Sequence, residues 1–219
     1  MSNNESFIDE VNEQVQNDKF YALLKRYGWI GIVAVVVVVG GTAYREYSNA
    51  QSTAAAQALG DSLMNGLELS EPADRSAALA AIDADGATAA IPAMLHATQA
   101  VDADDVAGAI ASLESVAANG DVDEVYRDIA GFKLLMLQGA DMSPADRKAA
   151  FEIYAVPGTP LRLLAMEQMV LADVDAGETE AALAGLTAIL EDAGLGLGLK
   201  RRSENLVTAL GGTVPDALN

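Results

Sequence analysis

The sequence predicts an all-α protein in which a single N-terminal transmembrane helix precedes a domain of helical hairpins. Three observations support this prediction. Residues 27–44 form an uncharged apolar segment long enough to cross a bilayer. Downstream, short apolar stretches with helical periodicity alternate with turns marked by glycine, proline and aspartate. No segment shows the alternation of polar and apolar residues that is typical of a half-exposed β-strand. The one run that favours β structure is a stretch of consecutive valines.

The uncharged segment 27–44 has the length and the flanking residues of a membrane-spanning helix. At about 1.5 Å per residue it forms roughly 27 Å of helix, close to the ~30 Å hydrocarbon core of a bilayer. Tyr27 and Tyr44 stand at its ends, where aromatic side chains favour the two interfaces. The residues expected to span the membrane are Trp29, Ile30, Ile32, Val33, Val35, Val36, Val37, Val38 and Val39.

Two alternatives account for part of the same segment. The consecutive valines at 35–39 favour a buried β-strand, although the length and the flanking aromatic residues argue against one. A cleaved signal peptide is the second alternative, because Gly41-Thr42-Ala43 offers a site of small residues. The region before it would be long and net negative, which is atypical of signal peptides. We therefore expect an uncleaved anchor.

Basic residues beside the segment predict its orientation. Lys19, Lys25 and Arg26 precede it, whereas Arg45 alone follows it closely and the next basic residue is Arg75. Because basic residues are retained on the cytoplasmic side, the N-terminus is expected in the cytoplasm and the chain from about residue 45 on the far side.

The N-terminal tail, residues 1–26, contains apolar residues at roughly helical spacing, among them Phe7, Val11 and Val15. The stretch 5–25 is therefore either an amphipathic helix on the membrane surface or against a partner, or a partly ordered tail. The spacing does not separate these two alternatives.

Beyond the membrane segment, the punctuation of the sequence predicts a series of short helices. Proline opens two of them, at Pro72 and Pro144, where its fixed φ suits the first helical turn. Thr88 is expected to cap a third helix. The helices are expected at about 49–68, 72–83, 89–101, 105–119, 122–138, 144–156, 160–175, 178–192 and 196–210.

Three stretches of this region share one pattern, namely a helix, a short polar turn, a second helix and a glycine. They are 93–120, 130–158 and 165–194, and their first residues lie 37 and then 35 residues apart. A period in the mid-thirties built from two helices is typical of tetratricopeptide arrays. Residues 45–219 are therefore predicted to form a tetratricopeptide-like helical repeat domain. The consensus tryptophan, glycine and tyrosine are missing, so the repeats are degenerate.

Composition excludes several functional classes. The formal net charge is −19, with 32 acidic against 13 basic residues, which disfavours nucleic acid because nucleic-acid binding needs clustered basic side chains. The chain has no cysteine, so thiolate zinc sites, iron–sulfur clusters, disulfides and a thiol nucleophile are excluded.

Nothing in the sequence marks a catalytic, cofactor or metal site. The single histidine, His96, lies in an apolar helix and is expected to be a packing residue. The acidic runs 83–85 and 102–105 lack the glycine and distal glutamate of a calcium loop, so helix caps and solvated turns are expected there. Motifs for a serine nucleophile, a phosphate loop or a zinc protease are absent. We expect no enzyme, no cofactor and no small-molecule substrate.

Methionine supplies a candidate partner face, because its flexible side chain packs against varied shapes. The residues are Met94, Met136, Met166 and Met169, of which the last two are one helical turn apart. Filling of the core is the alternative role. The basic cluster 200–202 is expected to pair with acidic neighbours of the same domain, and contact with lipid or an acidic partner is the alternative.

The whole plan resembles the YfgM-like ancillary subunits of the SecYEG translocon, which carry a tetratricopeptide-like domain. The residues that carry the resemblance are Lys25-Arg26-Tyr27-Gly28-Trp29 before the membrane segment, Tyr44-Arg45-Glu46-Tyr47 after it, and the hairpin Leu163–Leu183. The resemblance covers almost the whole chain, as an arrangement of segments more than as a sharp motif.

The resemblance implies a bacterial inner-membrane protein with a periplasmic domain that assists the folding or trafficking of exported proteins. Its implied partners are a SecYEG-like translocon, a periplasmic folding factor, exported clients and membrane lipid. The alternative function is that of a structural accessory subunit in another inner-membrane complex, respiratory or envelope, with no client binding.

Overall fold

The computed structural model describes the backbone of residues 3–214 and the side chains of residues 25–214. Within that part the chain is helical and contains no β-strand, which confirms the all-α prediction. The valines at 35–39 are accordingly helical and not extended. The chain divides into two units, Met1–Gly60 and Asp61–Asn219.

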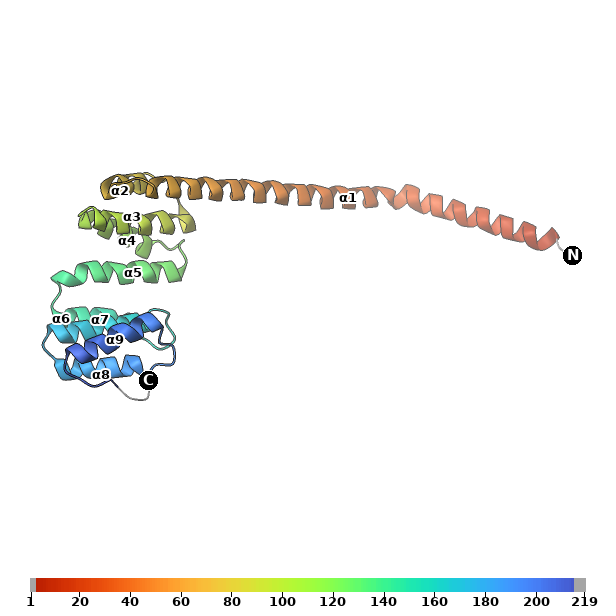
Figure 1. Cartoon of the computed structure of the whole chain (residues 1–219). Coiled ribbons are helices and arrows are strands. Elements are labelled where there is room, and N and C mark those ends of the chain that lie inside the picture. Colours follow the sequence, from red (N-terminus) through yellow and green to blue (C-terminus); the bar gives the residue numbers. More distant parts are fainter. Residues whose placement is uncertain (1–2, 215–219) are drawn as a thin grey trace. The chain divides into compact units, whose positions relative to one another are not determined.

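The first unit is most of one helix, α1 (Asn3–Leu67) (Figure 1). The predicted membrane segment and the helix expected at 49–68 are therefore continuous, because no proline interrupts them and Gly40 and Gly41 are accommodated within the helix. The backbone of the N-terminal tail is also helical from Asn3 onward. The side chains of residues 1–24 lie outside the described part, so an amphipathic tail stays a prediction.

The second unit contains the last turns of α1 and the remaining helices, close to the ranges expected from sequence. Short 3₁₀ turns connect some of them, at Gly86–Ala89 (η1), Gly139–Asp141 (η2) and Glu152–Tyr154 (η3). The α-helices are α2 (Pro72–Ala80), α3 (Ala90–Asp102), α4 (Val106–Ala118), α5 (Glu124–Gln138), α6 (Pro144–Phe151), α7 (Arg162–Asp175), α8 (Thr179–Leu190) and α9 (Leu197–Ala209).

Of the two expected helix caps at Ser143 and Thr88, one forms and the other does not. Ser143 caps α6 as its position before Pro144 suggests, since its hydroxyl accepts a bond of 3.2 Å from the Asp146 amide. Thr88 does not cap α3, contrary to expectation. It lies inside η1, where its hydroxyl donates to the Asp85 carbonyl at 2.8 Å, because a 3₁₀ turn leads into the helix at this point.

From α2 onward, helices that are neighbours in sequence pack against each other, with one exception. Close pairs run from α2 to α5 and again from α6 to α9, whereas α5 and α6 touch at few points (Figure 1). The predicted hairpins at 93–120 and 165–194 therefore form, as α3–α4 and α7–α8. The predicted hairpin at 130–158 does not close, because α6 packs mainly on α7.

The two hairpins that form, α3–α4 and α7–α8, have the same kind of turn. In each, the residue before the second helix bonds back to the first, with the Asp105 amide on the Ala100 carbonyl and the Glu178 amide on the Asp173 carbonyl, both at 2.8 Å. This C-terminal cap requires a left-handed residue before it. Gly177 is the left-handed residue of the α7–α8 hairpin, with a φ of 77°, and Asp104 is that of the α3–α4 hairpin, with a φ of 61°.

The core of the second unit consists of three connected clusters. The first lies between α3, α4 and α5 and is built from small and branched residues such as Ala97, Ala109 and Leu113. The last lies between α7, α8 and α9. Between them a smaller cluster joins Phe132 of α5 to Phe151 of α6, whose rings meet edge-on with centroids 5.1 Å apart. This aromatic cluster connects the two halves of the array.

The two matched turns predict opposite effects of exchanging their left-handed residues. Asp104→Gly should stabilise the domain by about 0.5–1 kcal/mol, because glycine adopts a positive φ without strain. Gly177→Asp should destabilise it by about 1 kcal/mol for the same reason. Urea unfolding of the full-length protein in mild detergent, followed by circular dichroism, measures both. Equal effects of the same sign would contradict this account of the turns.

Candidate protein-interaction surface

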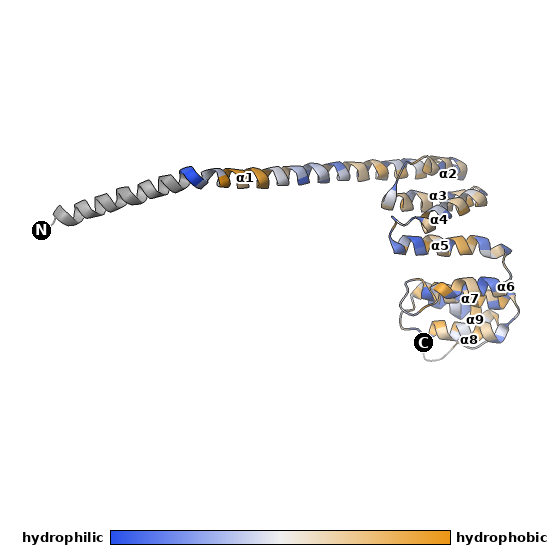
Figure 2. Ribbon diagram, turned by 180° about the vertical axis from the view of Figure 1, so that it is seen from behind, coloured by the Kyte–Doolittle hydropathy of each residue, from blue (hydrophilic) through white to orange (hydrophobic). Residues whose placement is uncertain are grey.

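An apolar segment of α1 has no packing partner among residues 25–214. The nine residues expected to span a membrane are helical and all exposed, from 48% for Ile30 and Val33 to 68% for Ile32. Figure 2 shows them as a strongly hydrophobic stretch that follows the hydrophilic residues at 25–26. The segment is long and apolar enough to cross a membrane.

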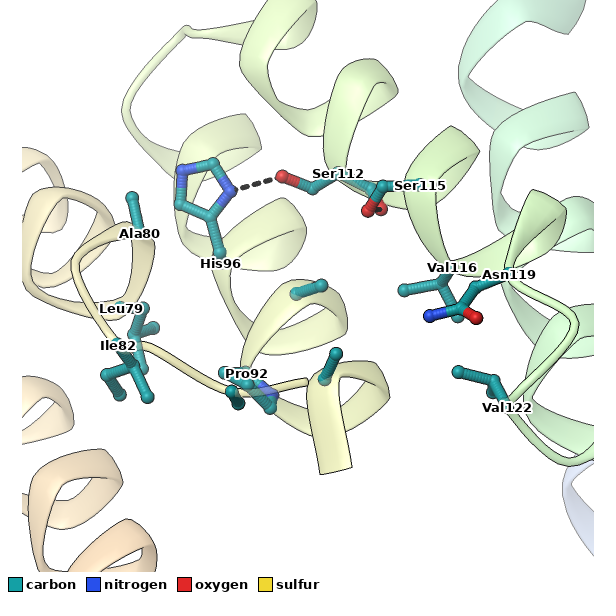
Figure 3. A pocket seen from close by; sticks show the side chains of 13 residues that line it. Leu79, Ala80, Ile82, Pro92, His96, Ser112, Ser115, Val116, Asn119 and Val122 are labelled. Atoms are coloured by element: carbon teal, nitrogen blue, oxygen red, sulfur yellow. Dashed lines mark hydrogen bonds between the residues drawn. The ribbon is translucent and has the colours of Figure 1, made fainter. Parts of the chain in front are cut away.

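A cavity of about 370 Å³ opens between α2, α3 and α4 of the second unit (Figure 3). One wall is apolar and includes Leu79, Ile82 and Pro92. The other carries uncharged polar groups on α4, among them Ser115 and Asn119. The cavity is therefore a mixed site in which apolar groups face hydrogen-bonding groups.

A smaller groove of about 220 Å³ lies between α3 and α5. Its surface is predominantly apolar and includes the exposed side chains of Val101 and Met136. Lys133 stands at its edge, where its ammonium group donates to the Thr98 hydroxyl at 3.2 Å. This α3–α5 groove has the chemistry that receives an apolar side chain of another protein.

The four methionines of the candidate partner face are not on one surface. Met94 packs against the cluster of α3, α4 and α5. Met166 packs against the cluster of α7, α8 and α9, and Met169 against the aromatic cluster. Only Met136 of the four is exposed, with half of its surface accessible. The contact of Met136 with a partner stays a prediction.

His96 pairs with a residue of the adjacent helix. Its Nδ1 lies 2.6 Å from the hydroxyl of Ser112, so the ring links α3 to α4 beside the cavity (Figure 3). Among residues 25–214, no group of three or more histidine and carboxylate side chains has the geometry to hold a metal ion. The acidic run at 102–105 contributes a cap instead, since the Asp105 carboxylate accepts from the Gly108 amide at 2.9 Å.

Comparison with protein families agrees with this architecture. Residues 22–151, more than half of the chain, match the profile of the tetratricopeptide repeat-like domain family. The chain belongs to this family. Repeats of this type are protein-interaction modules and typically have no enzymatic activity. Comparisons with curated proteins and with solved structures give no significant match.

The tetratricopeptide repeat-like domain holds most of its cations in internal bonds. In the C-terminal half, Arg147 pairs with Asp175, and Lys148 pairs at 2.5 Å with Asp173, a carboxylate that is almost completely buried. These two pairs join α6 to the end of α7.

Arg202 forms a two-pronged bond with Glu167 of α7, at 2.6 and 2.8 Å, which raises the pKa of the guanidinium. Lys200 lies 3.7 Å from Glu204, one helical turn away. These two basic residues therefore complement acidic neighbours of the same fold, as expected from the charge pattern. The geometry of the Arg202 pair is the fork that guanidinium and carboxylate favour.

The surroundings of Tyr154 and Asp192 shift the pKa values of these two side chains. Burial raises the pKa of the Tyr154 hydroxyl, and the nearby negative charge of Asp128 adds to the effect. Hydrogen bonds from the Arg162 side chain and the Gly194 amide lower the pKa of the Asp192 carboxyl. The bond between Arg162 and Asp192 joins the beginning of α7 to the residues just after α8.

The cavity was not identified from sequence, although its residues are ordinary. Ser112, Ser115 and the C-cap residue Asn119 follow helical spacing along one side of α4, next to buried Val116, which also lines the cavity. That stripe of small polar residues is a detectable signal. It becomes a cavity wall only because η1 and the end of α2 face it, and this is a tertiary feature.

The lowered pKa of Asp192 predicts a specific pH dependence of stability. The folded pKa lies below the unfolded value, so the stabilisation is complete above about pH 5 and is lost as pH falls through about 4 and below. Asp192→Asn keeps a hydrogen-bonding side chain but cannot ionise, so its stability should fall less steeply between about pH 5 and 3. Chemical unfolding at several pH values measures the slopes. Glu191→Gln, at the exposed neighbouring position, is the control and should retain the wild-type slope.

Proposed function

We propose that this protein is a single-pass membrane-anchored scaffold for protein interactions. In this proposal residues 1–26 lie in the cytoplasm, residues 27–44 cross a bacterial inner membrane, and residues 45–219 lie in the periplasm. The observation that carries it is the exposure of nine apolar side chains along α1, together with a domain of an interaction family.

The physical argument for the anchor is the energy of hydration. Fully burying one valine or isoleucine side chain contributes about 1.5–3 kcal/mol relative to water. Eight such side chains and Trp29 around one helix cannot be covered by a single neighbouring surface, since they point in all directions. A lipid environment removes them all from water. Lys25 and Arg26 on one side and the single Arg45 on the other support a cytoplasmic N-terminus.

The α3–α5 groove is the proposed contact for partner proteins. Val101 and Met136 offer exposed apolar surface, and the unbranched, flexible side chain of Met136 can adapt to different side chains of a partner. Adaptable contacts of this kind suit a protein that meets several clients. Anchoring by α1 would raise the local concentration of the domain near a membrane complex.

We propose further that the membrane complex is a SecYEG-like translocon, with a periplasmic folding factor as a second partner. The resemblance of segments 25–29, 44–47 and 163–183 to YfgM-like subunits supports this proposal. A structural accessory subunit of another inner-membrane complex is the competing function. The exposed α3–α5 groove favours the translocon role, since a fixed subunit has no need of an adaptable open contact.

Orientation is testable because the chain has no cysteine of its own. We expect a cysteine introduced by Thr213→Cys to react with a membrane-impermeant maleimide in spheroplasts. A cysteine introduced by Ser6→Cys should react only after lysis. Both variants should stay in the membrane after alkaline carbonate washing. The opposite labelling pattern would show that the proposed orientation is wrong. Extraction of the protein into the carbonate wash would show that α1 does not anchor it in the membrane.

The partners are testable by affinity purification of the full-length protein in mild detergent. We expect translocon subunits and a periplasmic folding factor to copurify. Replacing residues 1–47 by an unrelated anchor should abolish translocon copurification if the contact lies in the tail and the membrane helix. A stoichiometric respiratory or envelope complex without translocon subunits would refute the translocon role.

The groove is tested in the same experiment by Met136→Asp, which should reduce recovery of the folding factor or clients several-fold by placing a charge in an apolar contact. Val125→Asp is the matched control, since Val125 is similarly exposed on the same helix but does not line the groove. Equal losses for both variants would argue against the groove.

A further inference from the structure

The cavity between α2, α3 and α4 differs from the groove in its chemistry. About 370 Å³ in volume, it combines the apolar side chains of Leu79, Ile82 and Pro92 with hydroxyl and amide groups of α4. Its lining residues include no aspartate, glutamate, lysine or arginine, and the ring of the lining residue His96 is paired with the Ser112 hydroxyl. An occupant therefore meets apolar surface and hydrogen-bonding groups inside the cavity, and meets charge only outside it.

Negative charge surrounds this cavity on two sides. Asp83 and Asp85 flank the lining residue Ala84, and Asp121 and Asp123 flank the lining residue Val122. All four aspartates are exposed. No ion pair among residues 25–214 involves any of them.

Nearby cations leave this charge largely uncompensated. The Arg75 guanidinium donates to the Gln99 side chain and to the carbonyls of Leu69 and Ser70. Arg127 donates to the carbonyl of Val122, the residue between Asp121 and Asp123. One guanidinium against four carboxylates leaves a net negative rim. From Tyr27 onward the chain has 27 acidic and 10 basic residues, so no larger reserve of cations balances the rim.

We propose that this cavity binds a basic, extended segment of a partner polypeptide. A lysine or arginine side chain has an apolar stem that would lie along Leu79 and Ile82 and a cationic head that would reach the aspartates. The hydroxyl and amide groups of α4 would bond to the backbone of the same segment. Charge complementarity of this kind speeds association and selects against acidic competitors.

This inference rests on the protein-interaction function proposed above but assigns a second surface and the chemistry of its partner. A negative rim repels the anionic headgroups of a membrane, so a polypeptide fits this site and a lipid surface does not. The α3–α5 groove, in contrast, receives apolar side chains. The two surfaces can therefore be disabled separately.

The test uses the full-length protein in a nonionic detergent and a fluorescent ten-residue peptide of alternating lysine and alanine. We expect saturable binding, measured by fluorescence anisotropy, that weakens as salt screens the charges. Changing Asp83, Asp85, Asp121 and Asp123 together to Asn should weaken binding about tenfold or more, since four exposed charges each contribute modestly. Ser115→Trp should also abolish binding by filling the mouth of the cavity.

Matched controls separate a local site from general attraction to an acidic protein. The first control neutralises four exposed carboxylates outside the rim, by Asp141→Asn, Glu152→Gln, Glu180→Gln and Glu191→Gln. It should leave binding within about twofold, as should Ala111→Trp on an exposed position of α4 that does not line the cavity. Circular dichroism confirms the fold of each variant.

Three results would overturn the proposal, namely no binding by the wild type, equal weakening by both sets of neutralised carboxylates, and full binding by Ser115→Trp. Met136→Asp should bind the peptide normally. Failure of the groove in the affinity purification and failure of this cavity are therefore distinguishable.

Discussion

Close approach of neighbouring helices is the constraint on which the rest of the domain depends. Within the described residues, alanine supplies many of the fully buried positions, including Ala90, Ala100 and Ala109. At one crossing even a methyl group is too large, since a Cβ on Gly185 of α8 would lie 2.5 Å from a Val170 methyl of α7. Small residues allow the helices to pack closely, and each crossing is correspondingly intolerant of larger side chains.

Packing of this kind buries little area per residue, so the few large side chains carry a disproportionate share of the stability. Phe132, Phe151 and Tyr154 are concentrated where α5 gives way to α6 and α7. At that position the regular pairing of sequence neighbours fails, and edge-on aromatic contacts take its place. Gly131 also fits this site, because a Cβ there would collide with the Tyr154 hydroxyl.

The helices were largely predictable from sequence because their signals are local. Proline at Pro72 and Pro144, glycine at Gly177 and the capping serine at Ser143 act within a few residues. The failure of the middle hairpin was not predictable, since its helices have the same periodicity as the others. It follows from the packing of α6 mainly on α7, and this pairing is a tertiary feature.

The same distinction applies to the candidate surface. Exposure of the apolar residues of α1 could be expected, because no other segment matches their length and hydropathy. The methionines gave no such guidance, since one flexible side chain suits a core or a surface equally. Met166 and Met169 are one turn apart yet pack against different clusters, because α7 has neighbours on several sides.

Packing between sequence neighbours also determines how the chain reaches its native state. Nearly all interhelical contacts of the second unit join helices that are adjacent in the chain, so few contacts close long loops. Topologies of this kind fold rapidly. During synthesis, each new helix meets a finished surface left by its predecessor, and α3–α4 can dock before α7 exists. Phe132 of α5 finds its aromatic partners Phe151 and Tyr154 only after α6 and η3 have been made, so the link between the two halves forms late in vectorial folding.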